Sequence, residues 1–192
     1  MTSLEIAARS LIGTVFLISS LSKARSRAAY QDFAHSLARM RVVPPALQGL
    51  AAPAVVTAEF AVWALLAVPT AQAGTLGQLL ATSLLAAFTV GIARTVRRRS
   101  AVTCRCFGAS ATPVGVRHIA RNALLVVVAL SCLLAPVSGS ASAGEAAVAA
   151  LAGLAMGLVT AALDEILALF RPLTDIEADG SSTRFPIEPR ES

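Results

Sequence analysis

Apolar residues gather into five long runs along the chain, separated by short polar, basic or small-residue connections. A helix of about 20 residues spans the roughly 30 Å hydrocarbon core of a bilayer, and each run approaches or exceeds that length. The pattern predicts an all-α fold: a polytopic transmembrane helical bundle that forms a single integral membrane domain over residues 1–171, followed by a polar, disordered tail over 172–192. The predicted spans cover about residues 4–22, 46–68, 75–93, 118–136 and 145–170.

Residues 27–41 follow a different pattern from the five runs. Tyr30, Phe33, Leu37 and Met40 recur at helical spacing, and charged or polar residues fill much of the remainder. A helix with one apolar and one polar face lies in the plane of the membrane interface. We therefore expect an interfacial amphipathic helix between the first and second spans.

Composition supports a membrane protein. Apolar residues make up 56% of the 192 residues and charged residues only 14%, which leaves too few charges to cover the surface of a soluble domain. The lipid bilayer is therefore the first expected partner. The arginine cluster that begins at Arg94 directly follows a span and has no accompanying aromatic-basic surface, so it favours contact with phospholipid over nucleic-acid binding.

The basic residues predict the orientation in the cell (inner or plasma) membrane. Two connections hold them and the other two hold none. The positive-inside rule then places the N-terminus outside and the C-terminus in the cytoplasm, with both basic connections on the cytoplasmic side. The first of these connections carries Lys23, Arg25, Arg27, Arg39 and Arg41, and the second carries Arg94, Arg97, Arg98, Arg99, Arg105, Arg117 and Arg121.

Glu59 lies well inside the second span. An acidic side chain at that depth costs a few kcal/mol, so it should face the bundle and have a partner or keep its proton. Counting depth from one membrane face, we expect the partner to be Arg9 or the Thr14 hydroxyl, and not Lys23, which we place near the opposite face. Two roles stay open for Glu59: a structural hydrogen-bonding group and a proton relay.

A stripe on the first run combines small, aromatic and polar residues. Its members lie on one side of the helix at positions i, i+3, i+7 and i+10. The stripe suits either close packing of a neighbouring helix or a functional face. It consists of Gly13, Phe16, Ser20 and Lys23.

The last predicted span carries a G-x-x-x-G motif at Gly153 and Gly157. Small residues at this spacing let two helix backbones approach closely. The motif suits packing against another helix or homo-oligomerisation of the protein, and the sequence leaves both open.

Candidate chemistry centres on Cys104 and Cys106, which flank Arg105 in a C-x-C-F-G segment. A disulfide between them would close a small, strained ring that is readily reduced. Arg105 favours the attacking thiolate, and His118 could donate or accept a proton near physiological pH. These features suit thiol–disulfide exchange with a thioredoxin-like partner, which leaves open whether the protein is an enzyme.

Two alternatives remain for these cysteines. They could be inert structural residues, or they could bind metal together with His118 and His35. The ligand types suit zinc, although the spacing matches no established zinc pattern. Cys132, deep in the fourth predicted span, is expected to be a buried apolar residue. No segment identifies a quinone, haem or flavin site, so the cofactor stays unknown.

The segments described above resemble a known family. The stripe on the first run, the aromatic amphipathic segment and the span with Glu59 are similar to the opening half of the DoxX-like membrane proteins. The C-x-C-F-G segment and Arg121-Asn122 resemble the MauE branch, the methylamine-utilisation membrane proteins. The resemblance covers about residues 5–136. It implies a four-helix DoxX-like core, to which the fifth span and the tail are additions.

The resemblance also implies a role in protein maturation. MauE proteins are associated with making the disulfide-rich small subunit of methylamine dehydrogenase, beside a thioredoxin-like protein. Carried over to this chain, this makes Cys104 and Cys106 the redox pair, and Glu59 and Lys23 polar positions of the family. Two rival hypotheses stay open: a non-catalytic membrane scaffold of a maturation complex, and a small carrier centred on Glu59.

Overall fold

The computed structural model describes residues 1–40, 43–97, 116–134 and 139–169, and these residues form α-helices, one short 3₁₀ helix and no strand. The all-α prediction is therefore confirmed. The helices are α1 (Ser3–Ala24), α2 (Arg27–Arg39), η1 (Pro45–Leu47), α3 (Gln48–Ala67), α4 (Ala71–Arg97), α5 (Val116–Leu134) and α6 (Ala143–Leu169).

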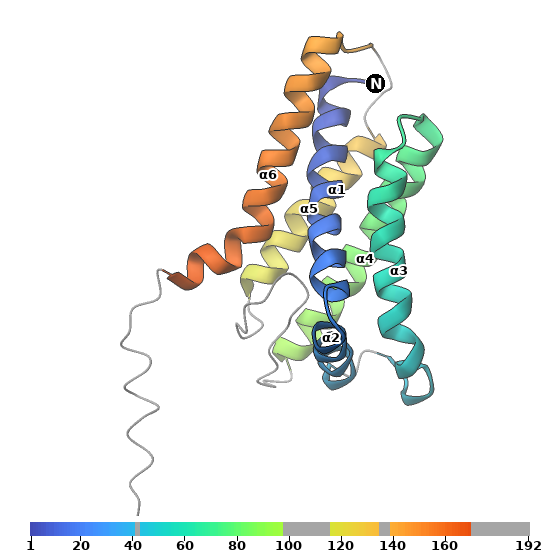
Figure 1. Cartoon of the computed structure of the whole chain (residues 1–192), viewed down its shortest axis with the longest axis vertical. Coiled ribbons are helices and arrows are strands. Elements are labelled where there is room, and N and C mark those ends of the chain that lie inside the picture. Colours follow the sequence, from blue (N-terminus) through green and yellow to red (C-terminus); the bar gives the residue numbers. More distant parts are fainter. Residues whose placement is uncertain (41–42, 98–115, 135–138, 170–192) are drawn as a thin grey trace, which may run out of the picture.

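The helices form an up-and-down bundle (Figure 1). In this view α1 stands between α6 and α3, and α4 and α5 lie behind them. The main packing partners of α1 are α6 and α3, and α4 packs on α3 and α5. The N-terminus lies at the upper end with the first turn of α6, and α2 lies at the lower end. This arrangement puts α1 at the centre of the fold.

Four of the described helices are long and apolar enough to cross a membrane: α1, α3, α4 and the Ala143–Ala162 part of α6. The structure therefore fits a polytopic helical bundle. The fourth predicted span, residues 118–136, corresponds to α5, whose apolar part His118–Leu134 is shorter than the other four. With 19 residues, α5 is about 28 Å long. That α5 crosses the bilayer stays a prediction.

The core of the bundle is made by apolar side chains from α1, α3, α4 and α5. Ile12 and Phe16 of α1 and Leu85 of α4 are fully buried. Many other large apolar side chains are exposed on the outside of the bundle, as expected for surfaces that face lipid. The most exposed include Leu50, Leu124, Val127, Leu134, Val148 and Leu151.

Helix α6 approaches α1 at its two glycines. A Cβ atom added to Gly153 would collide with the backbone carbonyl of Ala7, and one added to Gly157 would lie 2.8 Å from the Cβ of Thr14. The glycine faces are therefore covered by α1 of the same chain. Of the two uses expected for this motif, packing within the chain is the one observed. Homo-oligomerisation through Gly153 and Gly157 stays an untested prediction, and it would need a surface that α1 covers within this chain.

The glycine contact predicts the effect of a single methyl group. Gly153→Ala should lower the free energy of unfolding by about 1–3 kcal/mol, because the backbone of α1 cannot yield to the new Cβ. Gly144→Ala, in the first turn of the same helix, meets open space and should be neutral or slightly stabilising. Unfolding of both variants in detergent, followed by circular dichroism, measures the difference. Equal stability of the two variants would contradict the close α1–α6 contact.

Candidate functional site: a buried ion pair at one end of the bundle

Lys23 and Glu59 form an ion pair inside the bundle. Lys23 is 2% exposed and Glu59 is fully buried. The Lys23 Nζ donates to both carboxylate oxygens of Glu59 at 3.0 Å. Two buried charges at this distance compensate each other, so neither has to be neutralised in order to remain inside a membrane helix bundle.

Ser19 completes the site from one turn above Lys23 on α1. The Lys23 Nζ donates to the Ser19 hydroxyl at 2.6 Å and to its backbone carbonyl at 3.2 Å. The same hydroxyl donates to Oε1 of Glu59 at 3.1 Å. The Ser19 hydroxyl therefore bridges the ammonium and the carboxylate. Ser20, the serine of the predicted stripe, is buried but donates to the Leu17 carbonyl of its own helix.

Helix α2 covers the ion pair with an aromatic ring. The Lys23 Nζ lies 5.0 Å from the ring centroid of Phe33, within the range of a cation–π interaction. Phe33 is itself 2% exposed. Helix α2 begins after Ser26, whose hydroxyl accepts a hydrogen bond from the Ala29 amide at 3.1 Å. The cap and the apolar face of α2 thus fix this helix across the end of α1.

The expected partner of Glu59 was wrong. We expected Arg9 or Thr14 and excluded Lys23, whereas Lys23 is the observed partner. Equal depth counting failed because α3 begins beyond the end of α1 (Figure 1), so Glu59 lies about 16 Å along α3. In addition, helical side chains lean towards the N-terminus, which lets Lys23 reach back by one turn to the level of Ser19.

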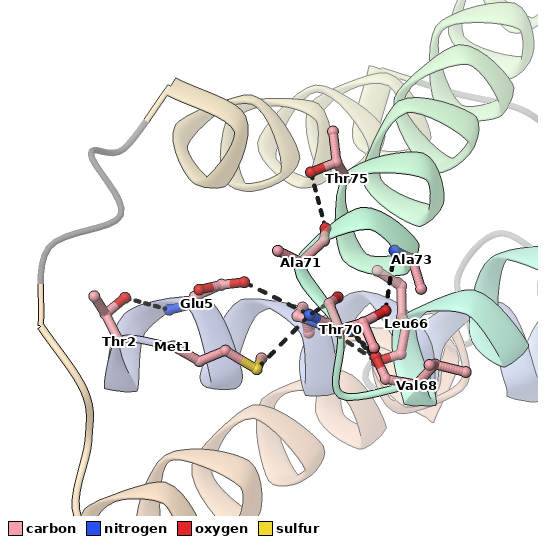
Figure 2. Close-up of polar contacts among 10 residues, drawn as sticks. Met1, Thr2, Glu5, Leu66, Val68, Thr70, Ala71, Ala73 and Thr75 are labelled. Atoms are coloured by element: carbon pink, nitrogen blue, oxygen red, sulfur yellow. Dashed lines mark hydrogen bonds and ion pairs between the residues drawn. The ribbon is translucent and has the colours of Figure 1, made fainter.

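Arg9 instead binds the opposite end of α3. Figure 2 shows Leu66, Val68 and Thr70 at this end, where the chain turns from α3 into α4. The Arg9 guanidinium donates to the carbonyls of Leu66, Val68 and Thr70, at 3.1 Å for Leu66 and 3.3 Å for Thr70. It also lies 3.5 Å from the carboxylate of Glu5. The last carbonyls of a helix have no partner within the helix and carry partial negative charge, which Arg9 offsets.

Thr14, the other expected partner of Glu59, does not reach it either. The Thr14 hydroxyl donates to the Ser10 carbonyl of its own helix at 2.7 Å. Four residues separate the two positions, so this bond stays within one turn of α1. Thr14 therefore contributes to the local structure of α1 and to its contact with Gly157.

Cys104, Arg105 and Cys106 lie outside the described residues. The helices on either side of them are described: α4 ends at Arg97 and α5 begins at Val116. Both helix ends lie towards the end of the bundle that holds α2 (Figure 1). The connection that carries the two thiols therefore starts and finishes at the end of the bundle where Lys23 is buried.

The two histidines differ in burial and lie on different helices. His118, in the first turns of α5, is 9% exposed, and the polar residues Arg121 and Asn122 next to it are 7% and 1% exposed. His35 is exposed on α2. The alternative metal site needs Cys104 and Cys106 in addition to these histidines. Among the described residues, no group of three or more His, Cys, Asp or Glu is placed to bind a metal ion.

Cys132 is a free thiol near the other end of α5. It is partly buried rather than fully buried, so the expectation of a buried apolar position holds only in part. Because Cys132 lies far along α5 from the basic connection, its substitution can serve as a control for substitutions of Cys104 and Cys106.

Sequence analysis missed Ser19 as a member of the site. The signal was present, because Ser19 and Lys23 are four residues apart and therefore neighbours on one helix face. The predicted stripe took Ser20 instead, one residue further along. Phe33 was assigned to the apolar face of α2, but its position over Lys23 follows only from the tertiary packing.

Helices long enough to span a bilayer, together with an ion pair buried between two of them, define a multi-pass membrane protein with a polar interior site. The chain belongs to the MauE family: residues 1–135 match the family described as methylamine utilisation protein MauE. The expected MauE branch is thereby confirmed, and the family links this membrane protein to methylamine utilisation. Comparisons with curated proteins and with solved structures gave no match.

The matched region ends one residue after α5. It therefore contains α1 to α5, including the ion pair and the C-x-C segment, and leaves out α6. The additional helix nevertheless packs along α1, so it is part of the same bundle.

The ion pair predicts that single and double substitutions of Lys23 and Glu59 have non-additive effects on the free energy of unfolding. Lys23→Met and Glu59→Leu should each lower the free energy of unfolding by about 3 kcal/mol, because each leaves one buried ionisable group without its partner. The double variant Lys23→Met/Glu59→Leu should recover most of this loss. Arg25→Met removes an exposed charge and serves as the control. Unfolding of the four variants in detergent gives the coupling energy, and additive effects would contradict the pair.

Proposed function

We propose that this protein supports maturation of a partner protein by thiol–disulfide exchange through Cys104 and Cys106. The observation that carries the proposal is a C-x-C pair in a chain of the MauE family. The pair belongs to the connection between α4 and α5, whose flanking helices face the end of the bundle with the buried Lys23–Glu59 pair. A thioredoxin-like protein is the proposed exchange partner.

The proposed reaction is a balanced two-electron exchange. The thiolate of one cysteine attacks a disulfide of the partner and forms a mixed disulfide, and a partner thiolate leaves. The second cysteine then attacks the mixed disulfide. This step closes the Cys104–Cys106 disulfide and releases the partner as a dithiol. Run in reverse, the same steps oxidise a partner dithiol, so one pair serves either direction of exchange.

The charges around the C-x-C segment favour this chemistry. Arg105 stands between the two thiols in sequence, and a neighbouring cation favours the thiolate that attacks a disulfide. His118, about a dozen residues further on, lies buried in the first turns of α5. Both residues belong to the proposed site as tuning groups for the pair.

The contacts of the Lys23–Glu59 pair favour a structural role for the pair over a role as the site of a carrier. Each charge is compensated by the other and by Ser19, and α2 closes over them with Phe33. A carrier would have to release one member of this cluster in every cycle. A fixed cluster instead holds α1, α2 and α3 together.

The distribution of described charges supports the proposed orientation. Exposed basic residues lie at the end of the bundle that holds α2, and the N-terminus lies at the other end. We propose that the α2 end faces the cytoplasm and the N-terminus faces outward. The exposed residues at the α2 end are Arg25, Arg27, Arg39, Arg94 and Arg97.

Replacement of the pair tests the proposal directly. Cys104→Ser and Cys106→Ser should each abolish client maturation, since exchange needs both thiols. One of the two variants should accumulate a mixed disulfide with the thioredoxin-like partner, because its remaining cysteine can attack but the intermediate cannot be resolved. Non-reducing gels of cells expressing each variant detect this species.

Cys132→Ser is the matched control and should leave maturation intact. If both C-x-C variants mature the client as well as the control does, the exchange function is wrong. The non-catalytic scaffold then becomes the better account.

A further inference from the structure

A groove runs along the face of α1 opposite the core, with α3 as one wall and α6 as the other. Its volume is about 500 Å³, within the roughly 300–1,000 Å³ range of discrete ligand sites. Helices α3 and α6 each pack on α1 but have at most marginal contact with each other. The apolar side chains that line it include Ile6, Leu17, Trp63, Leu66, Leu151 and Leu154.

The side chains that line the groove offer no free charge to an occupant. Among the described side chains that line it, Arg9 is the charged one. Its guanidinium is engaged by three backbone carbonyls and by the carboxylate of Glu5. The Thr14 hydroxyl donates to the carbonyl of Ser10. These polar groups are satisfied within the protein, whereas the buried Nε1 of Trp63, which also lines the groove, makes no hydrogen bond to the described residues. Because most of the lining is apolar and its charged side chain is already bound, the complementary occupant is an uncharged, mainly hydrocarbon molecule.

The length of the groove matches one leaflet of a bilayer. Its floor extends from Ile6 to Leu17 on α1, which is about 16 Å along the helix axis. Half of a roughly 30 Å hydrocarbon core is about 15 Å. The groove begins at the end of the bundle that holds the N-terminus, where α3 ends at Ala67. Since α1 and α3 both have the length and composition of membrane spans, it opens towards lipid.

We propose that this groove binds one acyl chain of a bilayer phospholipid, in the leaflet on the N-terminal side of α1. The chain fills the space between α3 and α6 and joins two helices that hardly contact each other. This site is separate from the Lys23–Glu59 pair and from the proposed exchange reaction, because Ser19, Lys23 and Glu59 are not among the residues that line it.

Trp63 provides a specific reporter for the test. It lines the groove and is the single tryptophan of the chain. The full-length protein is purified in detergent, equilibrated with a phosphatidylcholine that carries a dibrominated acyl chain, and then transferred to lipid-free detergent. Bromine quenches tryptophan fluorescence on contact. We expect Trp63 to remain quenched after the transfer, and native mass spectrometry to find one retained phospholipid.

Groove-filling variants complete the test. Ala150→Phe fills the groove from α6 and Gly13→Leu fills it from α1, where a new Cβ would meet only Leu66 Cβ at 3.8 Å. Both should lose the retained lipid and the quenching. Val148→Phe, on the exposed face of α6, should keep both.

Three results would overturn the proposal. The first is full recovery of Trp63 fluorescence on transfer of the parent protein, with no retained lipid. The second is equal lipid retention in Ala150→Phe and Val148→Phe. The third is a retained mass that is not a phospholipid, which would assign the groove to another apolar ligand.

Discussion

The bundle depends on the compensation of two charges that cannot be left alone inside it. Burying a single ammonium or carboxylate costs several kcal/mol, and the mutual attraction of the pair offsets this only when the geometry is good and the remaining hydrogen bonds are made. Lys23 and Glu59 meet both conditions through Ser19. Because the two charges belong to α1 and α3, and α2 covers them, their pairing determines how three helices meet. Arg9 plays the corresponding part at the other end of α1, where it binds the Leu66 carbonyl in the last turn of α3 and the Thr70 carbonyl just before α4. Helix α1 is thus tied to α3 by one cationic side chain at each end.

Much of the fold follows from the sequence because a membrane limits the choices. A continuous apolar run can satisfy its backbone inside lipid only as a helix, so the runs predicted the long helices closely. The same argument placed the amphipathic α2, whose apolar face is a property of local spacing. The partner of Glu59 could not be predicted in the same way. It depends on how far α3 extends beyond α1 and on the direction in which the Lys23 side chain folds, and both are set by packing between helices. Ser19 and Phe33 entered the site for the same reason.

For helix α6, too, the sequence predicted a close contact, and only the tertiary structure identified the partner. Gly153 and Gly157 signalled a close helix contact, and the structure supplies the partner, α1 of the same chain. The family match ends before this helix, yet α6 is one of the main packing partners of α1. It also forms one wall of the apolar groove. At the Lys23 end, α1 contacts α2 and α3 around the ion pair. Nearer the N-terminus, the addition of α6 creates the apolar groove. A MauE-type core and its extension thus use the same central helix.

The proposed exchange function is tested most directly by the redox state of Cys104 and Cys106 in intact cells, in a Cys132→Ser background where these are the remaining cysteines. Cells that are maturing the client are labelled with membrane-permeant and impermeant maleimides, with and without prior reduction. The account predicts a fraction of the pair that reacts only after reduction. It also predicts reaction with the permeant reagent alone, because the proposed orientation places the segment on the cytoplasmic side. Two thiols that react fully without reduction while the client matures, with no mixed disulfide, would contradict the account.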